Sequence, residues 1–274
     1  MIELPEALTL AEQVNETLPG KTVTAVFNAT KLHRFTFFYN DPSKYAEMLV
    51  GKKVLSAKGY GMFVDVFFTG NAILSIGDGI NMRYRKADEK VPDNYQLLIV
   101  FDDESYLVFT VSMYGMIGVY LNEVIENIYH KISAESISPL DDEYTEEVYN
   151  TLFEDAKKTM SAKAFLATKQ RIPGVGNGVA QDILFNAKIN PKRKVSTFTD
   201  SQKKDLYQSL KNTLKAMASQ GGRDTQSDMW GNSGRYKTIL SANTWTEPCI
   251  RCGGKIVKES YMGGTIYYCK DCQM

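Results

Sequence analysis

The sequence predicts an α+β protein, in which an N-terminal helix and an antiparallel β-sandwich precede a helical domain and a small cysteine-rich module. Three observations support this prediction. Short runs of β-branched and aromatic residues fill the first half of the 274 residues, helical periodicity begins near residue 143, and all four cysteines lie in the last 26 residues. The expected domain ranges are 1–130, 131–245 and 246–274.

The first domain is expected to begin with a helix over residues 5–18, because apolar side chains recur there at helical spacing and Pro19-Gly20 ends the run. Glycine, asparagine and aspartate then separate short segments of strand-like composition. Several short strands at this spacing are typical of a sandwich or a partly closed barrel. The expected strands are 22–27, 54–57, 62–68, 72–76, 96–101, 106–111 and 117–121.

The second domain is expected after a linker at residues 133–142, which contains three serines and a proline. Helical spacing then predicts helices at 146–155, 162–170, 178–186 and 200–218, with a short helix around Ile189. A polar, glycine-rich loop over residues 221–234 connects the last of these helices to the cysteine segment.

The composition, with 43% hydrophobic and 23% charged residues, is that of a soluble globular protein. No apolar run reaches the roughly 18 residues of a membrane span and no signal peptide is evident, so we expect a cytoplasmic location without membrane contact. The zero net charge conceals an asymmetry. Residues 151–274 hold 20 Lys or Arg against 10 Asp or Glu, and residues 1–150 hold 12 against 22. The basic half suits an acidic polymer, although the charge taken alone slightly favours an ordinary solvated surface.

The cysteines form two CxxC pairs separated by sixteen residues, namely Cys249, Cys252, Cys269 and Cys272. Two such pairs can place four thiolates tetrahedrally around Zn²⁺, and four thiolates leave no open position for a substrate. The segment between the pairs reads as two strands, 255–257 and 266–268, joined by a turn at Gly263-Gly264. We therefore expect a β-hairpin zinc finger with a structural Zn²⁺.

Residues 171–178, RIPGVGNG, combine a tight glycine turn with the start of a helix. N–H groups at a helix N-terminus favour an anion such as a phosphate, although a plain helix–helix turn has the same composition. Basic residues on both sides favour contact with a phosphate backbone. These residues are Lys163, Lys169, Arg171, Lys188, Lys192, Arg193 and Lys194.

Three segments in this order resemble the formamidopyrimidine-DNA glycosylase and endonuclease VIII family along the whole chain: ELPE at 3–6, SAKAFLATKQRIPGVGNGVAQDILFNAKINP at 161–191, and the four-cysteine motif. The resemblance implies a β-sandwich domain, a helix–two-turns–helix domain and a zinc finger, with double-stranded DNA in the cleft of a monomer. It also implies excision of oxidised bases and cutting of the abasic strand by β,δ-elimination, with no cofactor beyond structural zinc.

The resemblance assigns the catalytic positions unevenly. Glu3 matches the acid that protonates the opening sugar, and Glu6 matches a second acid. The family nucleophile is an N-terminal proline, and Ile2 takes its place here. A lysine expected on a strand of the β domain is replaced by Met62.

The DNA contacts implied by the resemblance and by the flanking charge lie mainly in the second domain. Asn177 matches an asparagine that holds a phosphate, and Gly264 takes the place of an arginine at the tip of the zinc-finger hairpin. The expected DNA-binding residues are Lys163, Lys169, Arg171, Gly176, Asn177, Lys192 and the substituted position Gly264.

The proline substitution closes the usual Schiff-base route, because an amide nitrogen at residue 2 is not nucleophilic. Glu3 could still assist water, or the Met1 amine could form an imine. The leading hypothesis is a base-excision repair protein that acts on damaged or abasic DNA with its lyase chemistry impaired or rerouted. The alternatives are a non-catalytic binder of damaged or distorted DNA and a zinc-ribbon RNA-binding protein. Residues 221–227 correspond to a lid over a flipped base, although an exposed linker explains them equally well.

Overall fold

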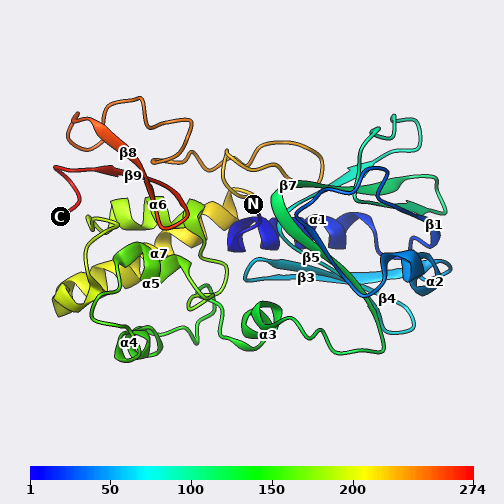
Figure 1. Ribbon diagram of the computed structural model, residues 1–274, viewed down its shortest axis with the longest axis horizontal. Coiled ribbons are helices and arrows are strands. Elements are labelled where there is room, and N and C mark those ends of the chain that lie inside the picture. Colours follow the sequence, from blue (N-terminus) through cyan, green and yellow to red (C-terminus); the bar gives the residue numbers. More distant parts are fainter.

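The computed structural model describes residues 1–274 as a β domain and a helical domain that meet at the N-terminal helix α1 (Leu4–Thr17) (Figure 1). Glu3 caps this helix, and its backbone N–H donates to the Glu6 carboxylate at 3.2 Å, as in a capping box. The face of α1 that holds Leu10 and Val14 packs into the β core, whereas Leu4 packs into the helical core. The start of α1 therefore lies at the junction of the two domains.

The β domain is one seven-stranded sheet in the order β1-β6-β7-β5-β4-β3, with β2 pairing in parallel with β7. A 3₁₀ turn (Pro42–Lys44) and the short helix α2 (Tyr45–Leu49) connect β2 to β3. The strands are β1 (Val23–Asn28), β2 (Thr36–Tyr39), β3 (Val54–Tyr60), β4 (Phe63–Phe68), β5 (Ala72–Arg85), β6 (Leu97–Phe101) and β7 (Tyr106–Leu121).

The long strands β5 and β7 connect two halves of this sheet. The segments 106–111 and 117–121, expected as separate strands, are one strand, and the β5–β7 register shifts between Asp78 and Ile80. A Cβ on Gly79 would lie 2.1 Å from the Ser112 carbonyl oxygen, so only glycine fits at this bulge. The start of β5 pairs with β4 and the start of β7 with β6, and both halves line one core of 28 buried residues.

The helical domain follows a connecting helix that was not expected, α3 (Ile128–Glu135). The predicted helix 162–170 ends at Ala167, because Lys169 and Gln170 adopt positive φ angles of 59° and 50°. The predicted short helix at Ile189 is wrong, since that residue is buried in irregular backbone directly after the turn at residues 187–188. The remaining elements are α4 (Glu146–Glu154), α5 (Ala162–Ala167), α6 (Asn177–Asn186), a 3₁₀ turn (Val195–Thr197) and α7 (Asp200–Ser219). None of the helices combines the length and the apolar character needed to cross a bilayer.

The C-terminal module is an antiparallel hairpin of β8 (Ile256–Tyr261) and β9 (Gly264–Cys269) that packs on α6 (Figure 1). The Gln181 side chain holds it there, because its Oε1 accepts the Tyr267 N–H at 3.1 Å and its Nε2 donates to the Thr265 carbonyl at 3.0 Å. The position of the hairpin is thus tied to the helix that starts at the glycine turn.

Asp182, also on α6, fixes the chain that leads to this module. Its carboxylate is fully buried and accepts the N–H groups of Ile239 and Leu240 at 2.9 and 2.8 Å. Burial raises the pKa of Asp182 to about 6, although these two N–H donors lower it.

This raised pKa predicts a pH-dependent stability. Between pH values of about 4 and 6 the folded chain retains a proton on Asp182 that the unfolded chain loses, so stability falls as the pH rises through this window. Relative to Asp182→Asn, the wild-type free energy of unfolding should fall by up to about 3 kcal/mol from pH 4 to pH 7. Urea denaturation of both proteins across this range measures the difference, and a difference independent of pH would contradict the prediction.

Candidate functional site

The carboxylate of Glu3 is the centre of the domain junction. Its Oε2 accepts the N–H groups of Gly176 and Val179 at 3.2 and 2.8 Å, and its Oε1 accepts the Gly178 N–H at 2.9 Å. Glu3 thus caps the N-terminus of α1 and, through its side chain, also the N-terminus of α6, where backbone dipoles favour a negative charge. The glycine turn does bind an anion, as its pattern suggested, but the anion is a side chain of the same protein.

Two glycines of the turn are required by this close approach. A Cβ on Gly178 would lie 1.5 Å from Nη1 of Arg223, and a Cβ on Gly176 would lie 2.8 Å from the Glu3 carboxyl carbon. The glycine pattern therefore reflects the fit between the N-terminus of the chain and the helical domain. In this structure the Gly176 N–H is used by Glu3 and does not face a phosphate site.

Arg223 supplies the positive charge for both acids. The side chain is 3% exposed; its Nη1 lies 3.3 Å from Glu3 Oε1 and its Nη2 lies 2.8 Å from Glu6 Oε2. Its backbone N–H and Nε also donate to Glu6 Oε1 at 3.1 and 3.0 Å. Burial alone would lower the pKa of Arg223, but the two carboxylates raise it above its ordinary value. The cluster is a buried, charge-assisted network in which each oxygen of Glu3 has two donors.

Ile2 and Met62 are both inside the protein. The Ile2 N–H donates to the Asp78 carbonyl at 2.6 Å, and its side chain is 4% exposed within the β core. Met62, at the β3–β4 turn, is 8% exposed and lies against the side chain of Gln170. Neither position therefore presents a nucleophile or a cation to a ligand.

Lys163, Asn177 and Gly264 meet on the other side of the glycine turn. Lys163 donates from Nζ to the Tyr261 carbonyl at 2.6 Å, and Asn177 donates from Nδ2 to the Thr265 carbonyl at 3.0 Å. A Cβ on Gly264 would lie 3.4 Å from the Lys163 Nζ and 3.5 Å from the Asn177 side chain. Burial lowers the pKa of Lys163. The structure therefore brings these three expected residues into one cluster, beside the tip of the zinc-finger hairpin.

The other expected basic residues lie outside this cluster. Lys192 pairs with Glu259 at 2.6 Å on the zinc-finger hairpin. The guanidinium of Arg171 lies 5.7 Å from the centre of the Phe165 ring, and its Nε is buried without a hydrogen-bond partner. Lys169 is exposed in the turn after α5.

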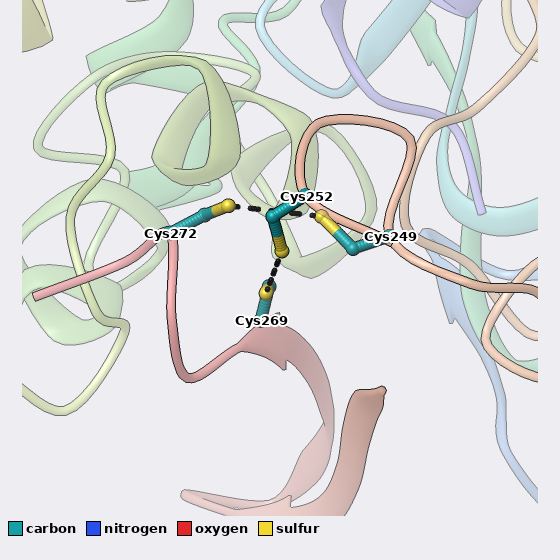
Figure 2. Close-up of side chains that lie close together, drawn as sticks. All are labelled: Cys249, Cys252, Cys269 and Cys272. Atoms are coloured by element: carbon teal, nitrogen blue, oxygen red, sulfur yellow. Dashed lines mark hydrogen bonds between the residues drawn. The ribbon is translucent and has the colours of Figure 1, made fainter. Parts of the chain in front are cut away.

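The four cysteine sulfurs converge at the base of the hairpin (Figure 2). All lie within 4.8 Å of one another, with Cys249 and Cys272 at 3.8 Å and Cys252 and Cys269 at 3.5 Å. These separations are too long for disulfide bonds. Four sulfurs about 2.3 Å from a tetrahedral Zn²⁺ would be about 3.8 Å apart, so the donor set and its spacing fit this ion.

The sequence reasoning missed Arg223 as the partner of Glu3 and Glu6. One signal for such a partner was available. Both acids lie on the side of α1 that carries its apolar residues, so both are expected to be buried. A buried carboxylate requires a cation or several N–H donors. The helix Leu4–Thr17 contains no basic residue. The cation therefore had to come from a distant segment, which local patterns do not identify.

Comparison with known proteins matches this architecture to one family. The model of the formamidopyrimidine-DNA glycosylase H2TH domain matches residues 136–228. The formamidopyrimidine-DNA glycosylase of Mycoplasmopsis pulmonis is 27% identical over 282 residues, covering 100% of this chain and 98% of the relative. That of Listeria monocytogenes is 28% identical over 283 residues, covering 100% of both chains.

Two solved structures share the fold. The Lactococcus lactis Fpg in complex with DNA containing an abasic site superposes with a TM-score of 0.83 at 20% identity, covering 99% of each chain. The MutM (Fpg) protein from Thermus thermophilus superposes with a TM-score of 0.81 at 21% identity, covering 99% of this chain and 98% of that one. With relatives along its full length, a matched helical domain and this four-cysteine cluster, the chain is a divergent member of the formamidopyrimidine-DNA glycosylase family of DNA repair proteins.

Proposed function

We propose that this protein is a base-excision repair protein that binds duplex DNA with a damaged base or an abasic site, next to the domain junction. The observation that carries the proposal is the placement of Glu3 where the two domains meet. The relatives that match the full length of the chain are DNA glycosylases, which links this position to DNA repair. The charge asymmetry supports it, since the helical domain and zinc finger belong to the basic half of the chain.

The cluster of Lys163, Asn177 and Gly264 is the proposed phosphate contact. Lys163 and Asn177 each give one N–H to a hairpin carbonyl and retain further N–H donors, and Gly264 adds no side chain over them. Lysine and amide donors at one place hold a phosphate and set the register of the duplex. The four cysteines would hold a structural Zn²⁺ that fixes the hairpin beside these donors.

Lys163→Met tests this contact. We expect this variant to bind all duplexes more weakly by a similar factor. The slope of the logarithm of the affinity against the logarithm of the salt concentration should fall by about 1, which corresponds to the loss of one phosphate contact. Lys158→Met, on the same domain but outside the cluster, is the matched control. Equal salt slopes for both variants would contradict the assignment.

The usual proline-dependent chemistry has no equivalent residue here, because the Ile2 nitrogen is bonded within the β domain and its side chain lies in the core. We propose that turnover depends on Glu3 instead, whose carboxylate could orient water or stabilise positive charge on the opening sugar. The second candidate is a non-catalytic binder of damaged DNA. This candidate is favoured because four N–H donors already bind the Glu3 carboxylate, which leaves it engaged within the protein and not with a substrate.

A panel of duplexes that carry an oxidised purine, an oxidised pyrimidine, an abasic site or no lesion tests the proposal. We expect tighter binding to at least one damaged duplex than to the undamaged one, and strand cutting of that duplex. Borohydride added to each reaction shows whether an amine forms a covalent intermediate. Equal weak binding to every duplex, without cutting, would refute the proposed function.

Glu3→Gln separates the two candidates. If Glu3 acts in turnover, the rate of strand cutting should fall by about 10²-fold or more while damaged DNA is still bound. Glu12→Gln, an exposed change on the same helix, is the control. Binding without cutting by the wild type, unchanged in Glu3→Gln, would instead establish the non-catalytic binder.

A further inference from the structure

A buried polar network ties the connecting helix α3 to the β domain (Figure 1). Val64 and Val66 of β4 lie in the main core, so the alternation of the strand places Asp65 on the opposite face of the sheet. Asp65 is nevertheless only 2% exposed, and its Oδ2 lies 2.8 Å from Nε2 of His130 on α3. A carboxylate is thus buried where the connector between the two domains meets the sheet.

Tyr60, at the end of β3, completes the network. Its hydroxyl donates to Asp65 Oδ2 and lies 2.8 Å from His130 Nε2. Because a carboxylate accepts hydrogen bonds, the hydroxyl and the imidazole nitrogen both serve as its donors. Burial and the charge of Asp65 raise the pKa of Tyr60, so its hydroxyl keeps the proton that it donates. The three side chains, Tyr60, Asp65 and His130, are here called the lock.

The lock is not needed merely to pack a helix on a sheet. Apolar side chains of similar volume often pack such an interface at least as stably, whereas a buried charge depends on the geometry of each donor. Asp65 Oδ1 is buried without a hydrogen-bond partner, so the carboxylate depends on the two donors at Oδ2. Any movement of α3 that withdraws His130 therefore leaves a buried carboxylate with fewer donors, which is costly.

The β3–β4 turn carries this placement of α3 to the glycine turn. Tyr60 and Asp65 lie on either side of the turn, which contains Gly61. A Cβ on Gly61 would lie 2.3 Å from the Ser133 Oγ of α3, and a Cβ on Gly174 would lie 2.5 Å from the Gly61 carbonyl oxygen. The turn therefore contacts α3 on one side and the glycine turn on the other.

Gln170 and Leu4 extend these contacts to Glu3. The Gln170 side chain donates to the Met62 sulfur and accepts the Gly174 N–H at 3.0 Å. The Gly174 carbonyl in turn accepts the N–H of Leu4, the residue directly after Glu3, at 3.0 Å. A continuous set of contacts thus runs from the lock to the residues that cap the Glu3 carboxylate.

We propose that His130 is a positioning residue. Through Tyr60 and Asp65 it fixes the β3–β4 turn, and through that turn it holds the glycine turn in the place where its N–H groups cap Glu3. The lock is a property of the free protein, so it can be tested without DNA. Its effect on turnover rests on the proposed function, in which Glu3 acts on the opening sugar.

Four variants separate the lock from simple packing. His130→Phe removes the donor to Asp65 but keeps a ring, whereas His130→Gln keeps an N–H donor and should rescue the effect. Tyr60→Phe removes only a hydroxyl and provides a second route to a weakened lock if His130→Phe does not fold. Tyr129→Phe, the same change at a half-exposed tyrosine of α3, is the matched control.

Native-state amide exchange measures the coupling in the absence of DNA. In His130→Phe and Tyr60→Phe, we expect residues 128–135 and 174–180 to exchange faster than in the wild type. The acceleration should exceed that of β6, across the β domain, by at least about tenfold. His130→Gln and Tyr129→Phe should exchange like the wild type.

Two exchange results would overturn the proposal. Faster exchange of residues 128–135 alone would show that the lock supports only α3 and does not reach the glycine turn. Equal acceleration of both segments and β6 would show a global loss of stability without a specific coupling.

A second measurement tests the consequence for turnover. At a saturating concentration of damaged duplex, His130→Phe should lower kcat by about tenfold or more with little change in KM, and His130→Gln should restore it. Coupled exchange with an unchanged kcat would overturn the positioning role of His130. If the wild type cuts no duplex, the proposed turnover fails, and the exchange result still decides whether the lock holds the glycine turn.

Discussion

Arg223→Met is expected to lower the free energy of unfolding by about 3–5 kcal/mol, because it leaves two carboxylates buried without their cation. The Arg223, Glu3 and Glu6 side chains are 3%, 2% and 7% exposed, so water cannot replace the guanidinium without a rearrangement of the junction. The loss should appear in urea denaturation at neutral pH as a lower midpoint. Methionine has a similar length, which limits the contribution of a cavity to the effect.

Arg235→Met is the matched control for this prediction, since Arg235 is exposed and directly follows the segment 221–234. Its effect should stay within about 0.5 kcal/mol. A double variant, Arg223→Met with Glu6→Gln, should recover part of the loss, because it removes one of the two unpaired charges. Equal stability of Arg223→Met and Arg235→Met would show that the network does not support the junction.

The location of the network explains which parts of the site could be predicted. Glu3 and Glu6 lie in the short ELPE segment, one of the three segments that carry the family resemblance, and the resemblance assigned both as acids. Their partner is 217 to 220 positions away along the chain, where only tertiary packing selects one arginine among many. Long-range pairing of this kind leaves no local periodicity, so the resemblance carried by the ELPE segment singled out the two acids but nothing in the sequence singled out the cation.

The glycine turn shows the same limit in a different form. Its pattern correctly indicated N–H groups that point at an anion. Whether that anion is a phosphate or a carboxylate from the same chain depends on the approach of α1 to α6, which brings Glu3 within 2.8 Å of the Val179 N–H. The fold class was accessible for a related reason, because the strand and helix periodicities are local. The continuity of β5 and β7 was not, because their bulge depends on the partner strand.

Removal of metal from the four-cysteine cluster should have the largest effect on the C-terminal module. The core in which it packs contains only six buried residues, two of which, Phe185 on α6 and Leu240, lie outside the module. One structural Zn²⁺ contributes about 10–16 kcal/mol in such small modules. A purified chain should therefore contain one zinc per molecule. Cys269→Ser or a strong chelator should abolish amide-exchange protection over β8 and β9, while α1 and the β domain keep theirs.

The consequence should extend to DNA through α6. Asn177 and Gln181 hold the hairpin by way of the Thr265 carbonyl, so an unfolded finger removes Gly264 from its place beside Lys163. We expect damaged-DNA binding to be lost upon chelation and restored by added Zn²⁺. Ile250→Ser, an exposed change between two cysteines, is the control and should leave zinc content and binding unchanged. If a zinc-free chain keeps both the protected hairpin and its DNA affinity, the four cysteines do not depend on a metal. Only a finger that folds without the ion could then hold Gly264 in position.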